Sequence, residues 1–190
     1  MEELASFAEK TGKWLIVDEA FIEFAGEEYS LARKAAQMRR LIVIRSATKF
    51  FGIPGLRLGY AVSHPETIKA LKIFQPAWSV NALAREAAVF IVKDKVFQKQ
   101  SRDFTASERK WFASEIENVG WFKVHPSRAN FLLCEITQDP VLLDAYQMFD
   151  DLGKQGLFIR ICSNFTGLDS RFFRVAVRTR EENQRLINAF

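Results

Sequence analysis

The chain has 190 residues, which is enough for one domain or two small ones. Hydrophobic residues make up 48% of it and Phe occurs 18 times, so the composition excludes a disordered chain. The net charge of +4 comes from 27 Lys and Arg against 23 Asp and Glu. Because no basic run interleaves with aromatic residues, we expect no nucleic-acid partner.

Other features limit the compartment and the kind of site. No apolar run is long enough to span a membrane and the first residues lack a signal-peptide pattern, so we expect a cytoplasmic protein with no membrane partner. Cys134 and Cys162 are too few for a disulfide framework and lie in apolar segments, which favours buried thiols. His64 and His125 each precede a proline without a second ligand nearby, so we expect no metal site.

The first part of the chain alternates between helical and strand patterns. In chain order the expected elements are a helix over residues 1–12, a strand over 13–18, a helix over 29–39, strands over 41–46 and 56–62, and a helix over 65–74. This alternation is typical of an α/β sheet.

The remainder of the chain reads as helices that pack on a small, antiparallel sheet. The expected elements are a helical region over residues 80–117 interrupted near 93–95, strands over 121–124 and 129–136, a helix over 140–155, strands over 157–161 and 172–177, and a final helix from 181. We place the domain boundary within the long helical region, which gives domains of residues 1–80 and 81–190, the second of which includes the long connecting helix.

The N-terminal region has an unusual order of elements. The run Trp14-Leu15-Ile16-Val17 follows the first helix at once and reads as a strand buried on both faces. Such strands belong to parallel sheets and need neighbours on both sides. We therefore expect the chain to begin in the middle of a domain.

The most informative residue is Lys49. It follows the buried strand pattern Leu41-Ile42-Val43-Ile44 and stands among hydroxyl residues, before a Gly/Pro turn and an arginine. A lone lysine in a turn is usually a solvated charge. A lysine at the end of a strand, beside hydroxyls and a fixed cation, instead suits a Schiff base with an aldehyde cofactor that carries a phosphate.

Asp18 ends the strand that precedes it, where ligands bind in open α/β sheets. An aspartate at this place can also cap the next turn, and for Asp18 alone the two interpretations are equally good. Together with Lys49 it offers the carboxylate that would pair with a protonated pyridine nitrogen, as pyridoxal phosphate requires.

Three further side chains suit the cofactor phosphate. Arg57 can bind phosphate oxygens in a bidentate way through its guanidinium, and the hydroxyls of Ser46 and Thr48 can donate to the same phosphate oxygens. The alternative for Arg57 is a salt bridge to a carboxylate. Gly55 and Gly59 allow the backbone to approach closely.

Arginines in the last apolar strands are costly unless they are paired. For Arg178 we favour a structural ion pair, whereas Arg160 and Arg174 could equally hold an anionic substrate group. Asn130 and Asn164 fit either turn residues or polar contacts.

Trp78 and Asn81 lie at the break before the long helical region. They could approach a cleft, but we favour packing for Trp78 and helix capping for Asn81.

These segments together resemble the fold-type I pyridoxal-phosphate enzymes, and within them the histidinol-phosphate aminotransferase-like group. Residues 17–21 look like the pyridine-nitrogen motif, and residues 46–60 look like the Schiff-base and phosphate motif. Residues 78–84, 159–165 and 172–183 look most like the threonine-phosphate decarboxylases of the cobalamin pathway within that group. The resemblance covers nearly the whole chain.

The resemblance implies a role for each matching residue. Lys49 would be catalytic and would carry pyridoxal 5'-phosphate. The other cofactor-binding positions would be Asp18, Phe21, Ser46, Thr48 and Arg57. Arg174 would hold the substrate carboxylate and Arg160 would help with the anionic groups of an amino-acid phosphate. Phe21 stands where many aminotransferases of the group carry a Tyr that bonds the ring oxygen.

The resemblance also implies a homodimer and a class I and II aminotransferase fold, of which this chain holds the C-terminal part of the large domain and a small α+β domain. Members are about twice as long, so the part before Met1 would carry the other wall of the cofactor pocket.

We therefore expect the parent enzyme to be a carboxy-lyase that acts on L-threonine O-3-phosphate. A histidinol-phosphate-type aminotransferase is the alternative. A second alternative is that this chain alone is an inactive remnant or fragment.

Overall fold

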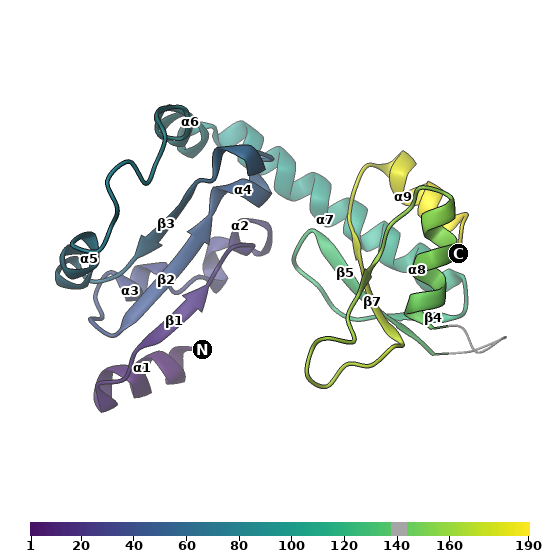
Figure 1. Cartoon of the computed structure of the whole chain (residues 1–190), viewed down its shortest axis with the longest axis horizontal. Coiled ribbons are helices and arrows are strands. Elements are labelled where there is room, and N and C mark those ends of the chain that lie inside the picture. Colours follow the sequence, from purple (N-terminus) through teal and green to yellow (C-terminus); the bar gives the residue numbers. More distant parts are fainter. Residues whose placement is uncertain (138–143) are drawn as a thin grey trace. The chain divides into compact units, whose positions relative to one another are not determined.

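The computed structural model describes residues 1–137 and 144–190 (Figure 1). The chain forms two compact units, Met1–Lys99 and Gln100–Phe190, which are described separately. Among the described residues, no helix is both long enough and apolar enough to cross a bilayer.

The first unit is built on a three-stranded sheet. Its strands are β1 (Leu15–Asp18), β2 (Leu41–Ser46) and β3 (Gly59–Val62), in the order β1-β2-β3. β1 and β2 run parallel, whereas β3 runs antiparallel to β2. The expected strand from residue 56 begins late, because Pro54–Leu56 form a 3₁₀ turn, η2.

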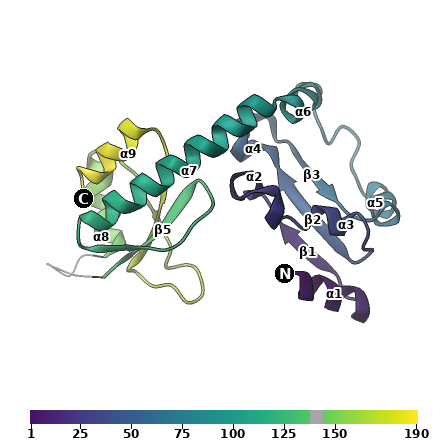
Figure 2. The ribbon, with the colours of Figure 1, turned by 180° about the vertical axis from the view of Figure 1, so that it is seen from behind.

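Helices surround this sheet. They are α1 (Glu2–Thr11), α2 (Ile22–Ala25), α3 (Ala32–Ala35), α4 (Ala47–Phe50), α5 (Pro65–Lys72) and α6 (Ala82–Lys93), with the 3₁₀ turn η1 (Glu27–Tyr29). α2 and α3 lie on one face of the sheet, which is the nearer face in Figure 2. There Leu31 and Ala35 pack with Leu41 and Val43 of β2 and Ala5 of α1.

The predicted helix over residues 29–39 is wrong in extent, since only the four residues of α3 are α-helical within it. The Glu9 carboxylate of α1 accepts the backbone N–H groups of Arg39 and Arg40, at 3.4 and 3.0 Å. These bonds hold the segment after α3 in a turn that leads into β2.

The expectation that β1 is buried on both faces is also wrong for this structure. Leu15 and Val17 pack on the core, but Ile16 is 60% exposed. Ile44 of β2 is 44% exposed on the same open face. The reason is that α1, α2 and α3 pack on the opposite side of these two strands.

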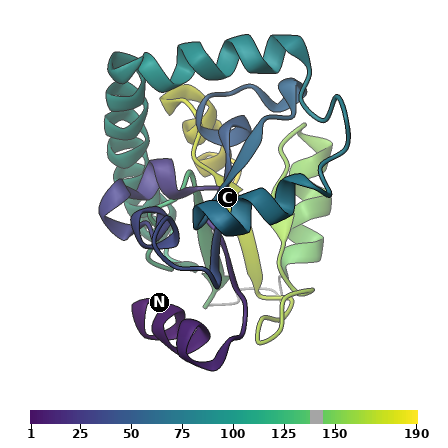
Figure 3. The same cartoon turned by 90° about the vertical axis from the view of Figure 1, so that its left-hand side faces the viewer.

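A long connection joins α5 to α6 (Figure 3). Trp78 in this connection is 97% exposed and has φ 62°, so the packing expected for it is wrong. Asn81 is the expected helix cap, because its Oδ1 accepts the N–H of Ala84 at 2.8 Å. Its Nδ2 also donates to the carbonyl of Leu56 at 3.2 Å.

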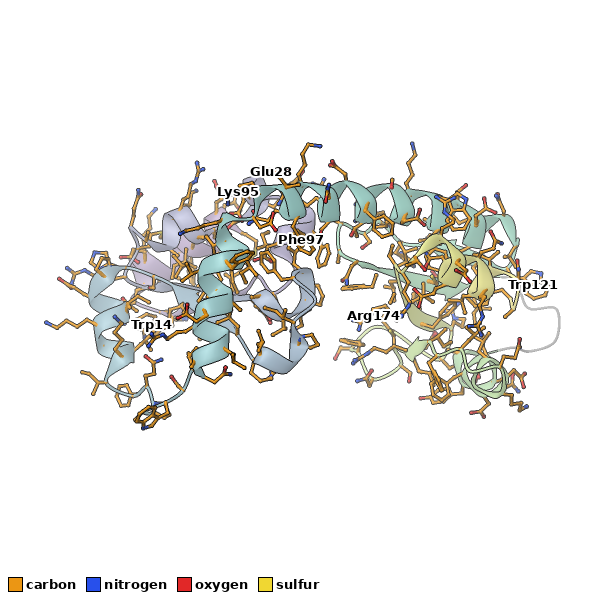
Figure 4. The ribbon with its side chains drawn as sticks, turned by 90° about the horizontal axis from the view of Figure 1, so that it is seen from above. Trp14, Glu28, Lys95, Phe97, Trp121 and Arg174 are labelled. Atoms are coloured by element: carbon orange, nitrogen blue, oxygen red, sulfur yellow. The ribbon has the colours of Figure 1, made fainter. Side chains whose placement is uncertain are left out.

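The long helix α7 spans Lys95–Asn118 and the two compact units divide within it. Phe97, labelled in Figure 4, lies before this division and stacks on Phe51 with 6.0 Å between ring centroids. Aromatic contacts of this kind place the start of α7 in the first unit. The boundary predicted at residue 80 divides the large domain from the small domain of the family, whereas this one divides two compact units. The boundary at residue 80 therefore stays a prediction.

The second unit is a four-stranded antiparallel sheet with helices on one face, as the sequence predicts. The strands, in the order β4-β5-β7-β6, are β4 (Phe122–Val124), β5 (Phe131–Ile136), β7 (Phe172–Ala176) and β6 (Arg160–Ile161). α7 is joined by α8 (Ala145–Lys154) and α9 (Arg180–Ile187). The start of the helix predicted over 140–155 lies outside the described residues.

One hydrophobic core holds the second unit together. Phe112 and Ile116 of α7 meet Phe173 and Val175 of β7, all almost completely buried. Because side chains alternate along a strand, residue 174 of β7 lies on the sheet face opposite this core.

Candidate functional site

Asp18 is the last residue of β1 and its side chain is exposed. Its Oδ1 accepts the N–H of Ala20 at 2.9 Å, so the aspartate does shape the next turn. Among the described residues, no donor bonds to Oδ2 of Asp18. Because β1 and β2 are parallel, Asp18 lies at the sheet edge from which α4 begins (Figure 1).

Lys49 lies in the short helix α4, directly after β2. Ser46 caps this helix, and its Oγ is 2.8 Å from the Thr48 hydroxyl and 3.4 Å from the Lys49 ammonium. Thr48 is buried whereas Lys49 is exposed. The structure therefore brings an accessible amine and two hydroxyls together at the end of β2, as the sequence predicts.

Arg57 precedes β3 and has the left-handed backbone φ of 53°. Its Nη1 donates to the carbonyl of Pro54 at 3.2 Å, and no carboxylate among the described residues pairs with it. The alternative of a structural salt bridge is thus not what this structure shows. A neighbouring glycine explains the close strand approach: a Cβ at Gly59 would meet the Arg45 carbonyl at 3.0 Å.

Phe21 is half-buried at the N-terminus of α2, three residues after Asp18. Its ring can offer apolar contact only. Its role in cofactor binding stays a prediction.

Arg160 and Arg174 are brought together in the second unit, because they are register partners on β6 and β7. Arg174, labelled in Figure 4, lies with its guanidinium carbon 4.4 Å from the centre of the Phe131 ring. Arg160 lies 5.4 Å from the ring of Phe165. Neither arginine has a carboxylate partner among the described residues.

The surroundings of Arg174 affect its charge. Partial burial lowers the pKa of Arg174, and the neighbouring positive charge of Arg160 lowers it further. Two cations held side by side without a counter-charge repel each other, and an anion between them would relieve that repulsion. This part of the sheet is therefore suited to an anionic ligand.

Arg178 has the structural role expected for it. Its guanidinium binds the Glu182 carboxylate at 2.9 and 2.6 Å. This pair holds the pKa of Glu182 well below its ordinary value, at about 2. Arg178 therefore forms a structural ion pair, whereas Arg160 and Arg174 have no such pair among the described residues.

Sequence reasoning missed a buried ion network next to the candidate site. Glu19 follows Asp18, and its Oε2 accepts from Arg45 Nε at 3.1 Å. A signal was present: strand alternation places Arg45 on the same face of β2 as the buried Leu41 and Val43. A charge on that face requires a buried partner.

Comparison with known proteins gives three clear similarities. The family described as "Aminotransferase class I and II" matches residues 1–190. A threonine-phosphate decarboxylase of Salmonella typhimurium is 36% identical over 92% of this chain and 47% of its own length. A histidinol-phosphate aminotransferase of Caldanaerobacter subterraneus is 34% identical over 99% of this chain and 51% of its own length.

Solved structures give the same result. The histidinol-phosphate aminotransferase from Clostridium acetobutylicum superposes with a TM-score of 0.92 at 33% identity, over 99% of this chain and 56% of that one. The chain thus spans about half the length of the relatives that it matches.

Proposed function

Because the chain belongs to the aminotransferase class I and II family, whose members are pyridoxal-phosphate enzymes of fold-type I, we propose that its parent protein is a pyridoxal-phosphate-dependent decarboxylase of L-threonine O-3-phosphate. The observation that carries this proposal is the accessible Lys49 amine beside the paired hydroxyls of Ser46 and Thr48. The decarboxylase of Salmonella typhimurium, at 36% identity, supports the choice of substrate.

The residues present fit this cofactor. The donor set at the end of β2 offers an amine for an aldehyde and two hydroxyls for phosphate oxygens. Arg57 carries a guanidinium with no carboxylate partner among the described residues, which suits the same phosphate. Asp18 leaves one carboxylate oxygen for a protonated ring nitrogen.

When bound, pyridoxal phosphate supplies an electron sink for the pair released from the substrate Cα. The chain's own residues have three tasks around it. Lys49 would hold the cofactor through its amine, and the same amine could move a proton at the substrate Cα. Asp18 would favour the protonated ring nitrogen, and the Phe21 ring would give apolar contact.

We assign Arg174 to the substrate carboxylate and Arg160 to the second anionic group. An amino-acid phosphate carries two anionic groups, and the two adjacent guanidiniums of β6 and β7 match that charge. In this proposal the arginines orient the substrate so that the bond to the carboxylate is the one that breaks. The proposed setting is a cytoplasmic homodimer that serves cobalamin synthesis.

A histidinol-phosphate-type aminotransferase is the second candidate. It is supported by the aminotransferase of Clostridium acetobutylicum, whose structure matches with a TM-score of 0.92. It would use the same residues but break the Cα–H bond. The full-length protein that contains this chain should release CO₂ from L-threonine O-3-phosphate without a keto acid. Amine transfer to a keto acid without CO₂ would reject the decarboxylase.

A simpler experiment tests the cofactor assignment on this chain. Pyridoxal phosphate is added, the mixture is reduced with borohydride, and the modified lysines are mapped by mass spectrometry. We expect Lys49 to be modified in preference to Lys69 and Lys72 of α5, which lie outside the proposed site. Folded chain with no preference for Lys49 would support the alternative of an inactive fragment.

A further inference from the structure

A buried ion network lies directly behind the proposed cofactor residues. The side chains of Glu19 and Arg45 are only 5% and 8% exposed. Arg45 donates from Nε to Glu19 at 3.1 Å and forms two bonds of 2.8 Å to the Glu27 carboxylate. Glu19 also accepts from the Ser30 hydroxyl and from the backbone N–H of Leu31, both at 2.7 Å.

The residues of this network are sequence neighbours of the proposed cofactor residues. Glu19 directly follows Asp18, and Arg45 directly precedes Ser46. The backbone N–H of Glu19 also donates to the carbonyl of Ile44 at 2.8 Å. The ends of β1 and β2 are therefore joined by one backbone bond and one buried ion pair.

The same network closes the segment between Asp18 and Leu31. Glu27 and Ser30 lie near the far end of that segment, and both bind Arg45. The segment includes Phe21, so its conformation is tied to the end of β2.

The network contributes more to the geometry of the strand ends than to the stability of the fold. A buried ion pair is often no more stabilising than apolar residues of similar volume, whereas loss of one partner leaves uncompensated buried charge. Without the Glu19 charge, Arg45 would lose its buried ion-pair partner and would keep the exposed Glu27 carboxylate, with Glu23 as a further nearby acid. Three donors, two of them buried, would lose a charged acceptor at the same time.

We infer that Glu19 and Arg45 are positioning residues, which hold Asp18 and Lys49 in fixed relation at the ends of β1 and β2. This inference rests on the proposed function for its chemical meaning, since it is the cofactor that would need both side chains at set places. The geometric part of it can be tested without any cofactor.

The first test is hydrogen exchange of backbone amides in the whole chain. The change Glu19→Gln keeps the side-chain shape but removes the charge. We expect exchange to accelerate on the order of tenfold at residue 19 and at Ala47, whose N–H donates to the carbonyl of Leu58. Mid-strand amides such as that of Val43 should change much less. Equal acceleration of all three would show a general loss of stability and would overturn the inference.

The chain contains a matched control. Glu108 is also buried, and its carboxylate binds Arg180 at 2.7 Å in the second unit. Glu108→Gln removes the same charge from a similarly buried glutamate, although its partner Arg180 is 54% exposed where Arg45 is 8% exposed. It should leave the exchange at residue 19 and Ala47 unchanged. If Glu19→Gln does not fold, Glu27→Gln alters the exposed arm of the same network and should show a smaller local acceleration at Ala47. No acceleration at Ala47 in either network variant would overturn the inference.

The second test uses pyridoxal phosphate and borohydride reduction. The preference for Lys49 over Lys69 should fall several-fold in Glu19→Gln and should persist in Glu108→Gln. If the unmodified sequence shows no preference for Lys49, the cofactor assignment fails for this chain alone, as the inactive-fragment alternative holds, and hydrogen exchange still decides whether the two strand ends are coupled. A preference that survives Glu19→Gln would show that the network does not position the lysine.

Discussion

Phe173 shows how strongly the second unit depends on its core, because it anchors the strand that carries Arg174. Its side chain is completely buried. Its ring meets Phe122 edge-on at 5.4 Å and Phe190 at 5.9 Å between centroids. Replacing a buried Phe with Ala costs roughly 3–5 kcal/mol. We expect Phe173→Ala to fall in that range and to destabilise β7 as a whole.

Phe158 provides the matched control for the same chemical change. It is 72% exposed, so only about a quarter of the loss is expected, on the order of 1 kcal/mol. Unfolding in urea can be followed by the fluorescence of Trp111 and Trp121, which pack on this core. Every variant also carries Trp14→Phe and Trp78→Phe, so that the fluorescence comes from the second unit. Equal destabilisation by the two substitutions would refute this account of the core.

Three further predictions concern single groups. Burial raises the pKa of Glu23 in the folded chain, so the charged carboxylate disfavours folding. Glu23→Gln should therefore raise the free energy of unfolding near about pH 7. This gain should disappear near about pH 3, where Glu23 is protonated in both the folded and the unfolded chain. Burial raises the pKa of Cys134 to about 12, so a thiol reagent should modify it only in the unfolded chain, and rapid native labelling would contradict its burial. Thr179 caps α9, so Thr179→Ala should cost about 1 kcal/mol in thermal or urea unfolding whereas Thr179→Ser should cost little.

The strand ends were the most predictable part of the molecule. Apolar runs fix β1 and β2 locally, and a parallel pair must bring its carboxyl ends to the same edge. Asp18 and the Ser46–Lys49 cluster could therefore be placed from the sequence without knowledge of tertiary contacts. The antiparallel sheet of the second unit was predictable for a similar reason, since alternating strands and turns are local signals.

Other features depend on contacts between distant residues. The helix predicted over residues 29–39 ends early because Glu9, from another helix, holds the backbone of Arg39 and Arg40. The exposure of Ile16 depends on which face the helices cover. The partners of Arg45 come from three places along the chain, so no local pattern could identify them.

Two neighbouring carboxylates, Asp18 and Glu19, are almost identical in chemistry but have opposite surroundings. One is exposed beside the proposed cofactor residues, and the other is buried in an ion pair. They are adjacent where β1 ends: Asp18 accepts the N–H of Ala20 at the strand end, and Glu19, the next residue, pairs with Arg45. Deleting a single residue in β1 would move Asp18 to the core-facing place of Val17 and Glu19 to the exposed strand end, which would leave Arg45 without its buried carboxylate. The register of β1 against β2 therefore determines which of the two acids is exposed and which is buried.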